Sequence, residues 1–149
     1  MVTHDLAALC GLEVPEAKLM RNSSHGSTFL TKRFDRDGEK RIHFATALTL
    51  LEKPETELGE YRVSVIDVAR FIREHGCAVK SDLPELWKRM LFDLAVRNTD
   101  NYLRNQAFLF SGKGWKLAPL FDALPDASAL CQQPVQTFEL LPQDRSRDF

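Results

Sequence analysis

The sequence has few of the residues that mark disulfide-stapled, zinc-bound or membrane-spanning proteins. Its three cysteines (Cys10, Cys77 and Cys131) are odd in number and widely spaced, and no Cys-x-x-Cys pair occurs. This pattern argues against a disulfide scaffold or a zinc site and fits a reducing compartment. No apolar run approaches the roughly 18 residues of a membrane span, and the N-terminus does not resemble a signal peptide. We therefore expect a cytoplasmic protein that does not associate with membranes.

An excess of either charge is also absent. The chain has 20 basic and 21 acidic residues, so no direct binding to nucleic acid is expected. The four histidines are scattered without i, i+4 spacing, which argues against metal binding through them. With 149 residues and 44% hydrophobic content, the chain is long enough for one domain with a sizeable core.

Hydrophobic periodicity and turn residues predict alternating short strands and helices. A helix ends at Gly11, because glycine is favoured after the last helical turn. Two strands follow at 13–20 and 27–34, then a helix at 44–52 and another at 64–76. Ser64 and Asp67 have the spacing of a capping box at the start of this last helix.

The strongest predicted helix covers residues 81–98, with Ser81 or Asp82 as its N-cap and Pro84 in its first turn. A wide apolar face places this helix deep in the core, and its members are Leu83, Leu86, Trp87, Met90, Leu91, Leu94 and Ala95. A hairpin is expected next, with strands at 107–110 and 115–120 joined by Ser-Gly-Lys-Gly.

Polar residues with the spacing Asp-x-x-x-x-Asn lie between this helix and the hairpin. Asp100 could accept the proton of a hydroxyl nucleophile, and Asn105 with Asp122 could bind magnesium through oxygen atoms. Protein kinases use the same order of base, amide and second aspartate. Asp and Asn are also common in loops because they satisfy backbone groups there. The spacing alone leaves both interpretations open.

The stretches RNTDNYLRNQAFLF and GWKLAPLFDALP resemble the catalytic region of the HipA-like serine/threonine kinases, toxin kinases of bacterial toxin–antitoxin modules. Members of this family carry N-T-D-x-H-x-x-N followed by G-W-x-L-x-P-x-x-D. The resemblance extends over LAALCGLEVPEAKL, FLTKRFDRDGEKRIHF and LGEYRVSVIDVARFIREHG, from about Leu6 to Pro125.

The resemblance implies an α/β (α+β) fold, a protein-kinase-like C-lobe that is mainly helical, with a hinge β-hairpin and a catalytic-loop β-hairpin, truncated at both ends. It predicts a single domain over residues 1–149, with its core at about 6–125 and a weakly structured tail at 132–149.

It also assigns roles to individual residues. Asp100 matches the catalytic base, and Asn105 with Asp122 matches the pair that binds Mg²⁺. Lys32 and Phe34 match the hinge that offers backbone groups to the adenine of ATP, with Asp35 near the ribose. The alternative for this segment is a half-buried strand with Phe34 in the core.

The sequence departs from the family pattern in two ways. Tyr102 occupies the position where relatives usually have histidine, which replaces an imidazole by an uncharged phenol. A Gly-rich loop and a credible phosphate-binding lysine are absent from these 149 residues, although kinase chemistry needs both.

The implied function is phosphoryl transfer from ATP to a protein serine or threonine, weak or absent in this chain alone. Its partners would be a protein substrate and an antitoxin or an N-lobe chain. One alternative is a non-catalytic remnant or the partner-binding half of a split kinase. A metal-dependent phosphohydrolase is a third, but more acidic ligands would be expected for it.

Overall fold

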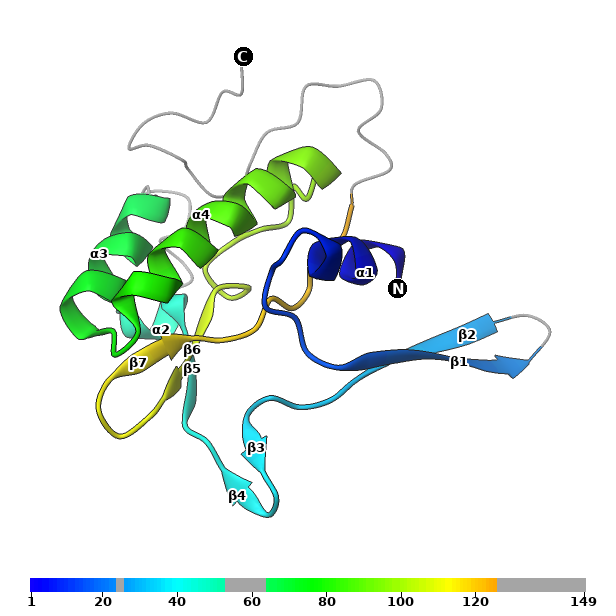
Figure 1. Ribbon diagram of the computed structural model, residues 1–149, viewed down its shortest axis with the longest axis horizontal. Coiled ribbons are helices and arrows are strands. Elements are labelled where there is room, and N and C mark those ends of the chain that lie inside the picture. The colour runs from blue at the N-terminus through cyan, green and yellow to red at the C-terminus, as the bar shows by residue number, and fades with distance from the viewer. Residues whose placement is uncertain (24–25, 53–63, 126–149) are drawn as a thin grey trace.

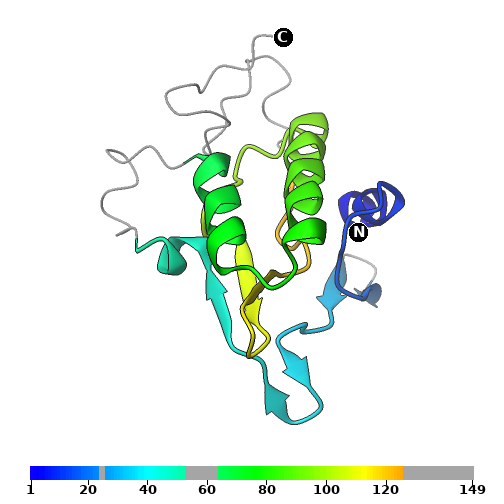
Figure 2. The ribbon, with the colours of Figure 1, turned by 60° about the vertical axis from the view of Figure 1, so that its left-hand side comes forward.

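The main core lies where two helices pack against a small antiparallel sheet (Figures 1 and 2). The helices are α3, Val65–His75, and α4, Val79–Val96. The sheet has the order β5-β6-β7, with β5 at Phe44–Thr46, β6 at Ala107–Phe110 and β7 at Trp115–Leu117. The structure, a computed structural model, describes residues 1–23, 26–52 and 64–125. The predicted tail at 132–149 lies outside these residues.

Helix α3 begins and ends where the sequence predicts. The backbone N–H of Ser64 donates to Asp67 Oδ2 at 2.9 Å, and the capping box is complete. Val68 and Ile72 are fully buried on the face toward the sheet. The helix ends at Gly76, where an added Cβ would lie 2.3 Å from the Ile72 carbonyl oxygen. Any larger residue at position 76 would therefore collide with the backbone of α3, and only glycine fits.

Helix α4 differs from its prediction at the start and in the face that it buries. It begins after Ala78, so neither Ser81 nor Asp82 is the N-cap. Trp87 is 63% exposed and Leu91 is 47% exposed, which contradicts the predicted apolar face. The buried side carries four charged residues alongside three apolar ones: Asp82, Glu85, Arg89 and Asp93, with Leu86, Met90 and Phe92.

The N-terminal part forms a separate arm beside the main core (Figure 1). Helix α1, Val2–Leu9, ends before Gly11, which has a φ of +72°, as predicted. The expected strand pair is present as β1, Ala17–Ser23, and β2, Gly26–Thr31, with shifted ends. A second, smaller hairpin follows, with β3 at Arg36–Asp37 and β4 at Lys40–Arg41.

The predicted helix at 44–52 is only partly helical. Phe44–Thr46 pairs with β6 as an edge strand, and α2 is confined to Ala47–Leu50. The Thr46 side chain caps α2 by accepting the N–H of Thr49 at 3.4 Å. Pairing with a strand about 60 residues away thus overrides the local helical pattern.

A buried ion pair on α4 joins three segments of the chain. Arg89 is 1% exposed, and its Nε lies 3.1 Å from Glu85 Oε1. Arg89 Nη2 donates to the Ala118 carbonyl oxygen at 2.7 Å, and Glu85 Oε1 accepts the N–H of Glu13 at 3.0 Å. Burial lowers the pKa of the Arg89 guanidinium, and the Glu85 carboxylate opposes that shift. The pair therefore fixes both the segment after α1 and the segment after β7 to α4.

Replacing Arg89 by Leu should lower the free energy of unfolding by about 3–5 kcal/mol, because the Glu85 carboxylate loses its buried counter-charge. Urea denaturation would measure the change. The control is Lys88→Leu, which removes a half-exposed partner of the same carboxylate, 3.1 Å from Glu85 Oε2. It should cost less than about 1 kcal/mol. Equal effects of the two substitutions would contradict the role given to Arg89.

Candidate functional site

The loop from Arg97 to Gln106 carries two of the predicted site residues. Arg97 ends α4 in the left-handed conformation, with a φ of +58°, and this turns the chain away from the helix axis. The side chain of Asp100 is exposed, whereas Asn105 is 6% exposed. The loop thus presents a carboxylate to solvent above a buried amide.

Asp100 and Asn105 are joined by a direct hydrogen bond. Asn105 Nδ2 donates to the backbone carbonyl oxygen of Asp100 at 2.9 Å. The N–H of Asn105 also donates to the carbonyl oxygen of Tyr102 at 2.8 Å, which closes a turn between the two residues. Because the amide nitrogen of asparagine only donates, Oδ1 is the side-chain atom of Asn105 that can bind a cation, and the bond from Nδ2 to Asp100 leaves Oδ1 for that role.

Several buried polar side chains lie beneath this loop, and the sequence-based reasoning missed them. Asn98, Asn101 and Gln106 are each at most 3% exposed. They form hydrogen bonds with one another or with Asp93 of α4. The dense run of amide residues in RNTDNYLRNQ could have predicted this network, because buried amide groups need hydrogen-bond partners.

Asp122 follows β7 with a φ of +56°, and its side chain is exposed. Such a backbone conformation is uncommon for residues other than glycine and often occurs at functional sites. The preceding residue, Phe121, packs against Phe34 and Phe44, with ring centroids 5.8 and 6.3 Å apart. These rings place Asp122 next to the predicted hinge.

The predicted hinge residues contact other parts of the chain. The N–H of Lys32 donates to the Glu16 carbonyl oxygen at 2.8 Å, which extends the pairing of β1 with β2. Phe34 is half-buried in the aromatic cluster with Phe44 and Phe121. Their roles toward adenine and ribose stay predictions.

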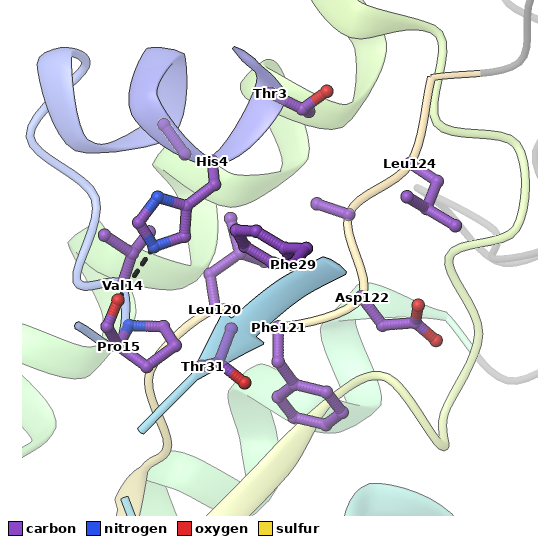
Figure 3. Close-up of a pocket in the computed structure, with 12 residues that line it drawn as sticks. Thr3, His4, Val14, Pro15, Phe29, Thr31, Leu120, Phe121, Asp122 and Leu124 are labelled. Atoms are coloured by element: carbon purple, nitrogen blue, oxygen red, sulfur yellow. Dashed lines mark hydrogen bonds between the residues drawn. The ribbon is translucent and has the colours of Figure 1, made fainter. Parts of the chain in front are cut away.

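A cavity of about 320 Å³ opens between α1, β2 and the segment that carries Asp122 (Figure 3). Its walls are mainly apolar, with Phe29, Leu120 and Phe121 among them. The ring of His4 lies at one side, held by a 2.7 Å hydrogen bond to the Pro15 carbonyl oxygen. Asp122 lines the cavity, and Asp100 and Asn105 do not.

The structure therefore brings Asp100 and Asn105 together, and it places Asp122 next to Phe121, whose ring packs against Phe34. Within the described residues, no three or more His, Cys, Asp or Glu side chains are arranged to hold a metal ion. The predicted magnesium site is of another kind, with an amide and a carboxylate supplemented by water and phosphate oxygens. In the same part of the chain, no helix is long and apolar enough to cross a bilayer.

Comparison with known proteins finds relatives for nearly the whole chain. The family model described as the HipA-like C-terminal domain matches residues 1–148. A candidate kinase of Sinorhizobium fredii, Y4mE, is 34% identical over 129 residues, which are 80% of this chain and 30% of that protein. A candidate kinase of Haemophilus influenzae is 27% identical over 123 residues, 75% of this chain and 36% of that protein. The chain thus spans about a third of these curated relatives.

Two solved structures share the fold. HipA of Shewanella oneidensis, in a complex with HipB and operator DNA, aligns with a TM-score of 0.71 at 17% identity, over 92% of this chain and 36% of HipA. The proinflammatory kinase CtkA of Helicobacter pylori aligns with a TM-score of 0.62 at 23% identity, over 82% of this chain and 44% of CtkA. The mixed α/β architecture with small antiparallel sheets is therefore confirmed.

The Asp35 carboxyl should titrate at about pH 2, well below its ordinary value of 3.8, mainly because it accepts a hydrogen bond from Arg33. The interaction therefore stabilises the fold above about pH 4 and is lost as the pH falls toward 2. Carboxyl-detected NMR would measure the pKa. Arg33→Gln should raise the pKa of Asp35 more than Arg36→Gln does. The reason is that Arg33 lowers this pKa both through its hydrogen bond and through its charge, and more than Arg36 does. A wild-type pKa near 4 would show that the pair does not form.

Proposed function

The chain belongs to the HipA-like C-terminal domain family, and we propose that it provides the base-and-metal part of a kinase-like C-lobe. The reaction would be transfer of the terminal phosphoryl group of ATP to a serine or threonine hydroxyl of a protein. The observation that carries this proposal is the hydrogen bond from Asn105 Nδ2 to the Asp100 carbonyl oxygen at 2.9 Å. It holds the Asn105 side chain against the backbone of the residue that carries the solvent-facing carboxylate.

Asp100 acts as the base in this proposal. Its carboxylate is exposed, so a substrate hydroxyl can approach it directly. The carboxylate accepts the hydroxyl proton as the oxygen attacks phosphorus. The backbone of Asp100 is held by Asn105, so the base keeps its position while the side chain faces the substrate.

Asn105 and Asp122 would hold Mg²⁺. Both offer oxygen atoms, the donors that this ion prefers, and few protein ligands are needed because water and phosphate oxygens complete the coordination. The Nδ2 of Asn105 is bonded to the Asp100 carbonyl oxygen, which leaves its Oδ1 as the atom for the metal ion. The Asp122 carboxylate is exposed beside the cavity. When bound, the ion would neutralise charge on the phosphate groups of ATP.

The nucleotide base would lie at the hinge. We assign backbone contacts with adenine to Lys32 and Phe34, and a ribose contact to Asp35. The aromatic cluster of Phe34, Phe44 and Phe121 supports this placement, because it holds the hinge against the residue that precedes Asp122.

A second candidate is the partner-binding half of a larger kinase assembly. It is favoured by the apolar residues that α1 and the β1–β2 arm leave exposed, which include Leu9 at 84% and Leu19 at 53%. The partner would be a chain carrying an N-lobe. An antitoxin is a further proposed partner, by analogy with the complex of HipA with HipB.

Mg²⁺-ATP should raise the melting temperature by a few degrees, since ligand at ten times its Kd stabilises by about 1.4 kcal/mol. ATP with EDTA should give a smaller rise, and Asn105→Leu and Asp122→Asn should lose the metal-dependent part. Asp37→Asn changes an exposed carboxylate on β3 and should bind like wild type. No shift at millimolar Mg²⁺-ATP would count against the hinge and metal assignments.

Phosphate incorporation into a generic protein substrate should be weak or absent with the isolated chain. The reason is that positioning supplies most of the catalysis in phosphoryl transfer, and these 149 residues contain no Gly-rich loop. Radiolabelled Mg²⁺-ATP would detect transfer. Strong incorporation that Asp100→Ala abolishes would show an active kinase and overturn this expectation.

A further inference from the structure

A single buried carboxylate lies at the centre of the polar network beneath the Arg97–Gln106 loop. Asp93 is 1% exposed and is the last charged residue on the buried side of α4. Its Oδ1 accepts Asn98 Nδ2 at 2.8 Å, and its Oδ2 accepts Asn101 Nδ2 at 2.5 Å. Asn101 Oδ1 in turn accepts Gln106 Nε2 at 2.9 Å. Hydrogen bonds to an ionised carboxylate are stronger than those between neutral groups.

These bonds hold the loop on both sides of the proposed base and metal ligand. Asn98 and Asn101 flank Asp100 in the sequence, and Gln106 directly follows Asn105. The backbone is tied as well, because the N–H of Asn98 donates to the Asp93 carbonyl oxygen at 2.8 Å. Two side chains of the loop region thus depend on the Asp93 carboxylate, and one backbone N–H binds the carbonyl oxygen of the same residue.

We propose that Asp93 is a positioning residue that sets the geometry of Asp100 and Asn105 through Asn98, Asn101 and Gln106. The assignment to metal and nucleotide binding rests on the proposed function, whereas the ordering of the loop does not. Asp93 does not itself contact the substrate or the metal ion in this proposal.

The chemistry of the network explains why a carboxylate serves here. An ionised carboxylate has acceptors only, so it can receive both amide groups at once. Arg89, one turn earlier on α4, feels the negative charge of Asp93, which raises the pKa of that guanidinium against the larger lowering by burial. The buried carboxylate therefore has a positive neighbour on its own helix.

A charge exchange within the network provides the test. Asn101→Asp would place a second carboxylate against Asp93 and break their hydrogen bond. Adding Asp93→Asn restores it, because the new amide can donate to residue 101 while its oxygen still accepts Asn98 Nδ2. The single and double variants carry the same carboxylate at 101, so their difference reports the state of the network. Asp93→Asn alone is a weaker test. Asn98 Oδ1 has no partner among the described residues, so the Asn98 amide can flip, exchange its oxygen and nitrogen, and accept a hydrogen bond from the new amide at position 93.

In the full chain, Asn101→Asp should weaken Mg²⁺-ATP binding by about 10- to 100-fold, the usual effect of losing an outer-shell partner of a metal site. The double variant should return to within about threefold of wild type. Hydrogen exchange of the loop peptide, followed by mass spectrometry, should be faster in the single variant and normal in the double.

The control is Asp82→Asn, which changes another buried carboxylate of α4 that accepts the N–H of Leu117 at 2.9 Å. It should lower stability without changing affinity or loop exchange at a temperature where every variant is folded. If Asn101→Asp does not fold, Asn98→Leu removes a single donor and takes its place.

The outcomes separate the two proposals. Unchanged affinity in Asn101→Asp, or no recovery in the double variant, overturns the positioning role. If wild type does not bind Mg²⁺-ATP, the proposed function fails and hydrogen exchange decides the inference alone. Loop exchange that recovers in the double variant supports it, and exchange that is identical in all variants overturns it.

Discussion

The buried pair of Glu85 and Arg89 is the constraint on which the arrangement of the chain depends. Through it, α4 holds the segment after α1 at Glu13 and the segment after β7 at Ala118. These two segments also bind each other, because the N–H of Leu120 donates to the Glu13 carbonyl oxygen at 2.7 Å. Asp122 lies two residues beyond this contact. Removing ions from water is costly, so such a pair persists only where its hydrogen bonds are satisfied, as they are here.

The same helix positions the other part of the candidate site. Its buried polar residues, Asp82, Glu85, Arg89 and Asp93, recur every three or four positions and so form one stripe along α4. Within this stripe, the ion pair holds the segment leading to Asp122, and Asp93 holds the Asp100–Asn105 loop. A single rigid helix can therefore keep the proposed base and the proposed metal ligands in a fixed relation, which is what phosphoryl transfer requires.

Local signals predicted much of the fold. The capping box of Ser64 and Asp67, the helix end near Gly11 and the hairpin of β6 with β7 need only neighbouring residues, and the structure confirms each of them. The prediction for α4 was wrong for Trp87 and Leu91, because periodicity marks a helix without showing which side is buried. The buried side of α4 instead includes Asp82, Glu85, Arg89 and Asp93, whose partners lie inside the molecule.

The sequence by itself determined the Asp100–Asn105 spacing, the order of helix, loop and hairpin, and the family to which they belong. Only the tertiary structure decided that Phe44–Thr46 is a strand, that Phe121, next to Asp122, packs against Phe34 of the predicted hinge, and that Asp93 lies under the loop. Helical turns and caps depend on residues a few positions apart, whereas these features depend on contacts between distant segments. Such contacts form only when the hydrophobic core brings the segments together.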